Sequence, residues 1–298
     1  MTNLISPTPR RLGSSFEIGP LGYGCWRLVA MSPAAAQARI ESALEHGMNL
    51  IDTADVYGLD WGGSAFGEAE ALLGKVLANS PSLRERMVLA SKGGIIPGVP
   101  YDSRNLAIAC DASLDRLGVE RIDLYQIHRP DLLAHPEQVA AQLTTVRAVG
   151  KIGEVGVSNH RPSQTAALQR YLDFPIVSQQ AEYSAVHLDP LFDGVFDQAM
   201  AEQQAVLCWS PLAGGRLATG QDIAPALLSA LDALAEREGV SRAVLATAFT
   251  LAHPAQPVSL CGSINLERIA ETARATTVSL DAADVYRIIE ASMGASLP

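Results

Sequence analysis

The sequence lacks long apolar runs and has little positive charge. No stretch of about 18 apolar residues occurs along the 298 residues, so we expect no segment that spans a membrane. The 22 lysine and arginine residues are outnumbered by 32 acidic residues, which gives a net charge of −10. This balance argues against general binding to nucleic acids or to anionic membrane surfaces.

Cysteines are also few and widely scattered. The four are Cys25, Cys110, Cys208 and Cys261, without a CxxC pair or the spacing of a zinc site. Because they lie inside apolar runs, we interpret them as small core residues in a reducing compartment, and we predict no bound metal. Residues 1–11 are polar and lack the apolar core of a signal peptide, so a cytoplasmic location is expected.

What the chain does contain is a regular alternation of short apolar strands with helical segments. Its 48% of hydrophobic and 18% of charged residues favour an ordered protein with a large core. Strands are expected at 21–25, 49–52, 87–91, 122–127, 153–157, 176–181, 205–209 and 258–261. Helical patterns follow them at 33–46, 64–78, 103–117, 137–149, 162–171, 191–203, 223–238, 241–252, from 266 onward, and at 282–293.

Eight strand–helix units without a linker or a change of composition favour one closed (β/α)8 barrel, a TIM barrel of the α/β class. We expect residues 1–298 to form this barrel as a single domain. The alternative is an open doubly wound sheet, which a G-x-G-x-x-G motif after the first strand would favour. Gly22 and Gly24 begin such a motif, but Arg27 stands where the third glycine should be, so the barrel is preferred.

In such a barrel the functional groups lie at the C-terminal ends of the strands, where all the strand-to-helix loops emerge. This rule selects a small set of residues: Asp52 and, in the loop after it, Tyr57; Lys92; His128; Ser158 and Asn159; Gln180; Trp209 and Ser210; and Gly262 and Ser263. We therefore expect a site at this end of the barrel.

Lys92 is the most informative residue of this set. The chain contains only three lysines, and this one directly follows an apolar strand. We expect a buried ion pair with Asp52 beside Tyr57, because a nearby ammonium lowers the pKa of a phenol and makes it a proton donor near neutral pH. The alternative is an ion pair at the barrel mouth without a catalytic role. His128 would add an imidazole, although a lone histidine at a strand end is more often structural.

Seven segments at these strand ends carry a resemblance to a known family. They are 47–58 (GMNLIDTADVYG), 89–92 (LASK), 124–131 (LYQIHRPD), 150–159 (GKIGEVGVSN), 179–183 (QQAEY), 208–212 (CWSPL) and 262–268 (GSINLER). In this order they resemble the aldo-keto reductases over essentially the whole chain. The sequences of the later segments are most similar to the bacterial branch of general NADP-dependent oxidoreductases.

The resemblance implies a catalytic tetrad and a carbonyl reductase that uses NADP(H). Tyr57 would be the general acid that protonates the carbonyl oxygen as the nicotinamide gives up its hydride. Lys92 and Asp52 would tune Tyr57, and His128 would hydrogen-bond and align the carbonyl.

The resemblance also implies a set of cofactor contacts. Ser158, Asn159 and Gln180 match the ligands of the nicotinamide carboxamide, and Trp209 matches the aromatic residue, usually tyrosine, that stacks on the ring. Further cofactor contacts are expected at Gly24, Cys25, Trp26, Asp52, Ser210, Pro211, Leu212, Gly214, Arg216, Gly262, Ser263, Asn265, Arg268, Glu271 and Thr272.

NADP is expected in preference to NAD. The segment 262–268 begins a helix, whose free N–H groups suit a phosphate, and Arg268 adds a charged donor. The resemblance assigns this segment to the adenosine 2′-phosphate. Gly262 replaces a lysine that some members have, and Thr272 replaces a common asparagine, so fewer contacts are expected here. The alternative is that Arg268 is a solvated charge paired with Glu271.

The expected partner is a small-molecule carbonyl substrate. Its pocket would be formed by Trp26, Tyr57, Trp61, His128 and Arg129, and short loops suggest an open site for aldehydes, diketones or small sugars. The alternative functions are a cofactor-binding regulatory subunit of a channel, and a metal-dependent isomerase or aldolase on the same barrel. A lysine held by a carboxylate stays protonated and is a poor nucleophile, which argues against a Schiff-base aldolase. A monomer or a weak homodimer is expected.

Overall fold

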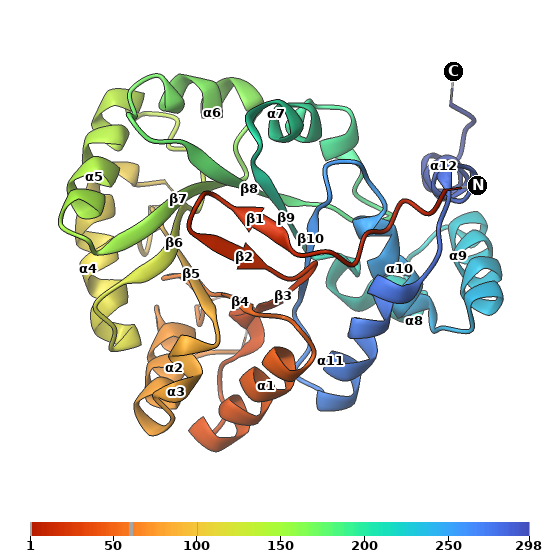
Figure 1. Ribbon diagram of the computed structural model, residues 1–298, viewed down its shortest axis with the longest axis horizontal. Coiled ribbons are helices and arrows are strands. Elements are labelled where there is room, and N and C mark those ends of the chain that lie inside the picture. The colour runs from red at the N-terminus through yellow and green to blue at the C-terminus, as the bar shows by residue number, and fades with distance from the viewer. Residues whose placement is uncertain (1, 60–61, 100, 298) are drawn as a thin grey trace.

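The computed structural model describes residues 2–59, 62–99 and 101–297, and Figure 1 labels its elements. Eight parallel strands close into a barrel in chain order, and the last strand pairs with the first. The barrel strands are β3 (Leu21–Gly24), β4 (Leu50–Asp52), β5 (Val88–Gly93), β6 (Ile122–Ile127), β7 (Ile152–Ser158), β8 (Ile176–Glu182), β9 (Ala205–Trp209) and β10 (Val258–Cys261). The predicted TIM barrel is therefore confirmed, and the open sheet is excluded.

Helices surround the barrel and connect its strands (Figure 1). They are α1 (Pro33–Glu45), α2 (Glu68–Asn79), α3 (Ser82–Glu85), α4 (Leu106–Leu117), α5 (Pro136–Ala148), α6 (Pro162–Gln169), α7 (Val195–Glu202), α8 (Arg216–Thr219), α9 (Pro225–Glu238), α10 (Arg242–Leu251), α11 (Leu266–Thr272) and α12 (Ala282–Met293). Short 3-10 turns are η1 (Cys25–Arg27), η2 (Ser103–Asn105), η3 (Asp189–Leu191), η4 (Ala213–Gly215) and η5 (Ala273–Thr277). The predicted start of α1 is confirmed, because the Ser32 side chain accepts a hydrogen bond from the N–H of Ala35.

Three helices begin three or four residues later than the sequence pattern predicts. Before α2 the backbone of Gly67 is left-handed, with φ +78°, and the Glu68 carboxylate accepts from the Ser64 hydroxyl over 2.9 Å. Before α7 the backbone of Gly194 is also left-handed, with φ +87°. In α4 the predicted first turn is instead the 3-10 turn η2. A left-handed glycine interrupts a continuous helix, so the apolar pattern alone overestimates the lengths of α2 and α7.

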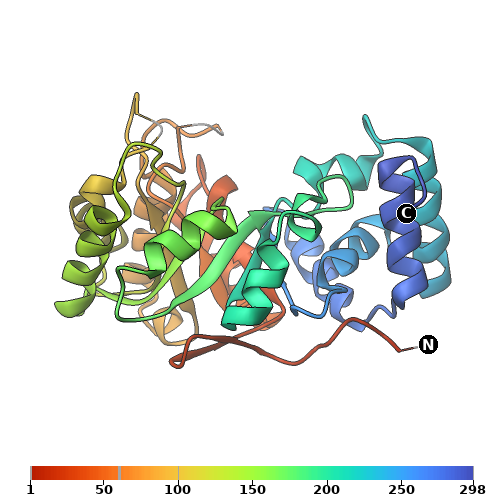
Figure 2. The same cartoon turned by 90° about the horizontal axis from the view of Figure 1, so that it is seen from above.

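An N-terminal hairpin, which the sequence did not predict, covers one end of the barrel. Strands β1 (Arg10–Leu12) and β2 (Phe16–Ile18) pair antiparallel, and Figures 1 and 2 show them crossing that end. Leu12 and Ile18 are fully buried and pack among inward side chains of the barrel strands, such as Leu50 and Leu124. The hairpin therefore seals the N-terminal end and leaves the C-terminal end of the strands for the site.

The last helix packs at the edge of the molecule. Val285, Ile288 and Ile289 of α12 are buried and form one apolar face. This face packs on α9 rather than directly on the strands, and α12 lies beside α9 in Figure 1. Met293, the last residue of α12, is 47% exposed. Among the described residues, no helix is long and apolar enough to cross a membrane.

Candidate active site

Four polar side chains meet at the C-terminal end of β4, β5 and β6. Asp52 ends β4, Tyr57 lies in the following loop, Lys92 is the fifth residue of β5, and His128 follows β6. The Lys92 Nζ atom lies 2.6 Å from Asp52 Oδ2, 2.9 Å from the carbonyl oxygen of Thr53 and 3.2 Å from the Tyr57 hydroxyl. The structure thus brings together the side chains that the sequence pattern selected, and one ammonium joins the carboxylate to the phenol.

Lys92 is fully buried and holds its proton. Burial alone would lower the pKa of the ammonium, but the neighbouring Asp52 carboxylate and Tyr57 hydroxyl outweigh it and hold the Lys92 pKa above its ordinary value. Asp52, only 2% exposed, is its ion-pair partner. A protonated lysine is not a nucleophile, so this geometry argues against the Schiff-base alternative.

The Tyr57 phenol departs from the sequence-based expectation in one respect. Burial raises its pKa, and the opposing effect of the Lys92 ammonium is smaller, so the net direction is upward. The expected net lowering is therefore wrong for this structure, although Lys92 acts in the predicted direction. At neutral pH the hydroxyl keeps its proton, which is the form that a proton donor needs.

His128 faces Tyr57 as a neutral imidazole. The two rings lie edge to face, with 5.8 Å between centroids. Burial, followed by the positive charges of Lys92 and Arg129, holds the pKa of His128 well below its ordinary value. The Nδ1 atom of His128 is buried without a hydrogen-bond partner among the described residues. A neutral imidazole carries one N–H group, so it can donate a hydrogen bond to an oxygen atom held between the imidazole and the phenol.

The expected carboxamide ligands form a connected network at the ends of β7, β8 and β9. Asn159 Nδ2 donates to the His128 carbonyl oxygen and to the Ser158 hydroxyl, each over 3.0 Å. Asn159 Oδ1 accepts from the indole N–H of Trp209 over 3.1 Å. The amide of Gln180 donates to Asp52 Oδ1 over 3.0 Å. The side chains therefore lie together at one edge of the barrel mouth, and Gln180 contacts the tetrad directly.

A glycine-rich segment follows Trp209 at the barrel mouth. Ser210 has φ +56°, and its hydroxyl accepts from the N–H of Gly214 over 3.2 Å. Gly214 and Gly215 both have positive φ, at +72° and +103°. Leu212 is half-buried and Pro211 buried, whereas Arg216, the first residue of α8, is exposed. The glycine backbone lets a ligand approach closely, at a segment where the sequence predicts cofactor contacts.

The segment after β10 is held by two contacts that the sequence did not predict. Its carbonyl oxygens at Ser263 and Ile264 accept from the Tyr23 hydroxyl over 3.1 Å and from Arg39 Nε over 2.8 Å. Asn265 caps α11 by accepting from the N–H of Arg268 over 3.0 Å. Both contacts involve residues more than two hundred positions earlier, and no local pattern indicates them.

Gly262 is exposed and open, whereas the Thr272 side chain is engaged within its helix. A Cβ atom at Gly262 would meet nothing within 4 Å. The Thr272 hydroxyl donates to the Arg268 carbonyl oxygen over 2.7 Å, which occupies it within the helix. Among the described residues, no ion pair joins Arg268 to Glu271, and the Arg268 side chain is exposed.

The remaining predicted residues frame the mouth. Gly24 ends β3, and Cys25 and Trp26 form η1 directly after it. Cys25 is fully buried, and burial followed by the Asp52 charge raises the pKa of its thiol, so the thiol is unreactive. Arg129 is exposed beside His128. The predicted pocket residue Trp61 lies outside the described residues.

Gln126 is a site residue that the sequence analysis missed. It is fully buried inside the barrel on β6, and its amide donates to Asp52 Oδ1 over 3.1 Å. The available signal was a polar residue two positions before His128 in a largely apolar strand, since residues two apart in a strand point to the same side.

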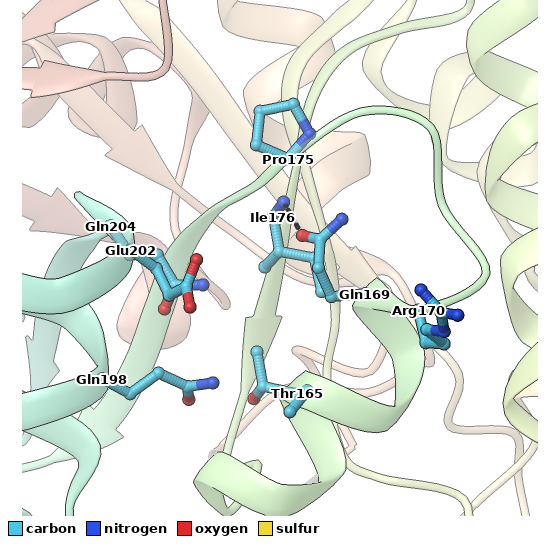
Figure 3. A pocket seen from close by; sticks show the side chains of 9 residues that line it. Thr165, Gln169, Arg170, Pro175, Ile176, Gln198, Glu202 and Gln204 are labelled. Carbon is cyan, nitrogen blue, oxygen red and sulfur yellow. Dashed lines mark hydrogen bonds between the residues drawn. The ribbon is translucent and has the colours of Figure 1, made fainter.

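A separate cavity lies on the outside of the barrel, between α6 and α7 (Figure 3). Its volume is about 310 Å³, and its lining contains none of the four tetrad residues. It is lined by Thr165, Ala166, Gln169, Arg170, Pro175, Ile176, Gln198, Glu202 and Gln204. Because its strand residue Ile176 begins β8, this cavity lies away from the C-terminal end of the barrel.

Comparison with known proteins places the chain in one family. The model of the aldo/keto reductase family matches residues 20–292. The chain is 46% identical over 300 residues to a 6-dehydroglucose reductase of Novosphingobium aromaticivorans, covering 99% of this chain and 98% of that protein. It is 33% identical to a 6-dehydroglucose reductase of Agrobacterium fabrum, covering 95% and 97%.

Two solved structures share the fold. A thermostable aldo-keto reductase crystallised with the inhibitor epalrestat has a TM-score of 0.81 at 23% identity and covers 95% of this chain and 99% of its own. An aldo/keto reductase from Klebsiella pneumoniae, crystallised with NADP and acetate, has a TM-score of 0.76 at 22% identity, covering 95% and 94%. The extent of the family match and the identity to the first relatives show that this chain belongs to the aldo/keto reductase family and is an oxidoreductase.

Proposed function

We propose that this protein is an NADPH-dependent carbonyl reductase, which transfers hydride from the nicotinamide to an aldehyde or ketone. The observation that carries the proposal is the position of Lys92 Nζ, which joins the Asp52 carboxylate to the Tyr57 hydroxyl at the open end of the barrel. Bound NADPH supplies the hydride. The protein must then supply a proton for the carbonyl oxygen.

Tyr57 is the proton donor in this proposal. Its raised pKa keeps the phenol protonated before the reaction. As the proton leaves, the developing phenolate lies 3.2 Å from the Lys92 ammonium, which stabilises it more than it stabilises the neutral phenol. Asp52 keeps that ammonium in place. The neutral His128 donates a hydrogen bond to the carbonyl oxygen and orients it toward the phenol.

The choice of NADPH over NADH follows from the segment after β10. Arg268 provides a positive charge and Ser263 a hydroxyl beside the open space at Gly262, which suits a phosphate group better than a free ribose hydroxyl. The network of Ser158, Asn159 and Trp209 would hold the carboxamide and stack on the nicotinamide ring. The glycines before Arg216 would approach the pyrophosphate.

The first substrate to examine is 6-dehydroglucose, because two relatives are named for its reduction. The 46% identity over nearly the whole chain supports a related sugar aldehyde. Trp26 and Arg129 frame the mouth, and they would offer an apolar face and a hydrogen-bond donor to such a molecule.

The test is the consumption of NADPH, followed by its absorbance, with 6-dehydroglucose, simple aldehydes and a quinone as substrates. Parallel reactions use NADH, and fluorescence titration measures cofactor binding separately. We expect turnover with NADPH and weak turnover with NADH. Binding of NADPH without turnover of any carbonyl would favour a cofactor-sensing role, and the absence of binding would contradict the proposal altogether.

We also propose that residues 1–298 form one cytoplasmic domain that acts as a monomer or a weak homodimer. The closure of the barrel through the pairing of β10 with β3 supports one unit. Sedimentation across a range of concentrations should give a monomer, with a dimer only at high concentration. A stable larger assembly would contradict this part of the proposal.

A further inference from the structure

The Asp52 carboxylate is held by side chains from three other strands of the barrel. Lys92 of β5 contacts its Oδ2 atom, whereas the amides of Gln126 on β6 and Gln180 on β8 both donate to its Oδ1 atom, over 3.1 and 3.0 Å. Gln126 is paired with Lys92 in the register of β5 and β6, and it is fully buried. It is a neutral residue, so it adds a donor to the carboxylate without adding charge.

The orientation of the Gln126 amide follows from the charge of Asp52. With Nε2 toward the carboxylate, the amide donates a charge-assisted hydrogen bond. The opposite orientation would place its oxygen against Oδ1, two acceptors in contact. In the observed orientation Oε1 is buried without a partner among the described residues. A buried acceptor without a partner costs free energy, so the hydrogen bond to Asp52 must outweigh the cost of leaving Gln126 Oε1 unpaired.

The neighbouring strand leaves room for this side chain. A Cβ atom at Gly156, which pairs with Gln126 across β6 and β7, would lie 3.1 Å from Gln126 Cγ and would clash with the Ser178 hydroxyl. The glycine therefore allows Gln126 to lie along the inside of the barrel and reach Asp52. Leu124, the preceding inward residue of β6, packs in the sealed apolar part of the barrel.

We propose that Gln126 is a positioning residue, which fixes the Asp52 carboxylate so that the Lys92 ammonium stays directed at the Tyr57 hydroxyl. This role rests on the proposed function, because Tyr57 acts as an acid only if a carbonyl is reduced. The charged and titratable groups around Tyr57 are Lys92 from β5, Asp52 from β4, Cys25 from η1 and His128 after β6. Gln126 acts on this group through Asp52 alone.

Loss of the donor has a defined consequence for Lys92. Without Gln126, the Asp52 Oδ1 atom keeps only the amide of Gln180 as a donor, and the less restrained carboxylate can turn away from the ammonium. Burial lowers the pKa of Lys92 and Asp52 opposes that effect, so a displaced carboxylate lets the Lys92 pKa fall. The ammonium is then lost at a lower pH, and the alkaline limb of the kcat profile moves to lower pH.

The test compares three variants with the wild type. Gln126→Met keeps the length of the side chain and removes its donor, and we expect kcat to fall about tenfold with the alkaline limb shifted to lower pH. In Gln126→Glu a carboxyl beside Asp52 keeps its proton at acid pH and donates it, so activity should be recovered there and lost as the pH rises. Gln179→Leu is the control: Gln179 is equally buried on β8, but its amide donates to the His160 carbonyl oxygen.

A crystal structure of Gln126→Met gives a readout that does not depend on turnover. We expect the Asp52 carboxylate to turn and its 2.6 Å contact with Lys92 to lengthen. An unchanged contact, an unchanged pH profile, or the same shift in Gln179→Leu would overturn the role of Gln126. A wild-type protein that binds NADPH and reduces no carbonyl would instead overturn the proposed function, and the crystal structure would still decide the position of Asp52.

Discussion

The indole N–H of Trp209 donates a hydrogen bond to the Oδ1 atom of Asn159 over 3.1 Å. Asn159 has a left-handed backbone, with φ +59°, and its own amide donates to the carbonyl oxygen of His128. Trp209 at the end of β9 is thus connected through Asn159 to the backbone of His128, which follows β6. A phenylalanine in place of Trp209 would keep an aromatic face but not this bond.

The first prediction concerns this hydrogen bond. Trp209→Phe should weaken NADPH binding about fivefold, because Asn159 loses the donor that orients its amide and a net hydrogen bond contributes about 1 kcal/mol. Fluorescence titration of NADPH measures the effect. Trp209→Ala, which also removes the stacking surface, should weaken binding further. Equal affinities for Trp209→Phe and the wild type would mean that the bond does not orient Asn159.

Asp55 gives a second prediction, on stability and pH. Its side chain is 1% exposed, and its Oδ1 atom has no partner among the described residues. Burial and then the nearby Glu70 carboxylate raise the pKa of Asp55 well above its ordinary value, against smaller opposing effects of Arg116 and Lys92. The folded protein therefore binds this proton more tightly than the unfolded chain does.

The sign of the pH dependence follows. The stability that Asp55 contributes is complete below its unfolded pKa and is lost as the pH rises toward the raised pKa of the folded state. Asp55→Asn cannot ionise, so its advantage in unfolding temperature over the wild type should grow with pH above about 4. Thermal unfolding across pH measures this advantage. A difference that is constant with pH, or that shrinks as the pH rises, would contradict the prediction.

The control for Asp55 is an acid with the opposite shift. The hydrogen bond from Arg242 lowers the pKa of Asp232, and its two oxygens lie 2.5 and 2.7 Å from the Arg242 guanidinium. The stability that Asp232 contributes is present above the pKa that it has in the unfolded chain, and it is lost as the pH falls. Asp232→Asn should therefore show no growing advantage as the pH rises.

A third prediction concerns the choice of cofactor. Arg268→Ala should raise the dissociation constant of NADPH about tenfold and leave that of NADH nearly unchanged, because the guanidinium would contact only the additional phosphate. Titration with both cofactors provides the measurement. Arg274→Ala is a matched control, since the Arg274 guanidinium donates to the Gly239 carbonyl oxygen on the outer surface. Similar losses for NADPH and NADH would exclude the assigned role of Arg268.

The N-terminal hairpin gives a fourth prediction. Leu12→Ala should lower the free energy of unfolding by about 2–5 kcal/mol, because the fully buried side chain seals the apolar interior of the barrel. Arg11→Ala, at the exposed position beside it, should have little effect. Urea unfolding measures both. Activity per folded molecule should stay unchanged in Leu12→Ala, and a selective loss of activity would mean that the hairpin influences the site.

The sequence predicted the barrel because every strand is a short apolar run with a helical pattern behind it. It also predicted the meeting of Asp52 and Lys92, since parallel strands deliver their C-terminal residues to one end. The hairpin was missed because its three-residue strands carry too short a pattern, and their stability comes from side chains contributed by distant strands.

Within the site, the sequence could indicate neighbours but not the balance of their effects. The direction of the Tyr57 pKa depends on burial against the charge of Lys92, and burial is a property of the whole fold. The contacts of Gln126 with Asp52 and of Arg39 with Ile264 span 74 and 225 residues, so no local pattern indicates them. Each joins side chains that only the closed barrel brings together.

The central claim is that Tyr57 donates the proton to the substrate, and one comparison tests it most directly. Tyr57→Phe keeps the ring beside His128 and removes only the hydroxyl that Lys92 contacts. We predict that kcat for carbonyl reduction falls at least about a hundredfold, while the affinity for NADPH measured by fluorescence stays within about twofold of the wild type. A variant that binds NADPH and keeps most of the wild-type kcat would contradict the account.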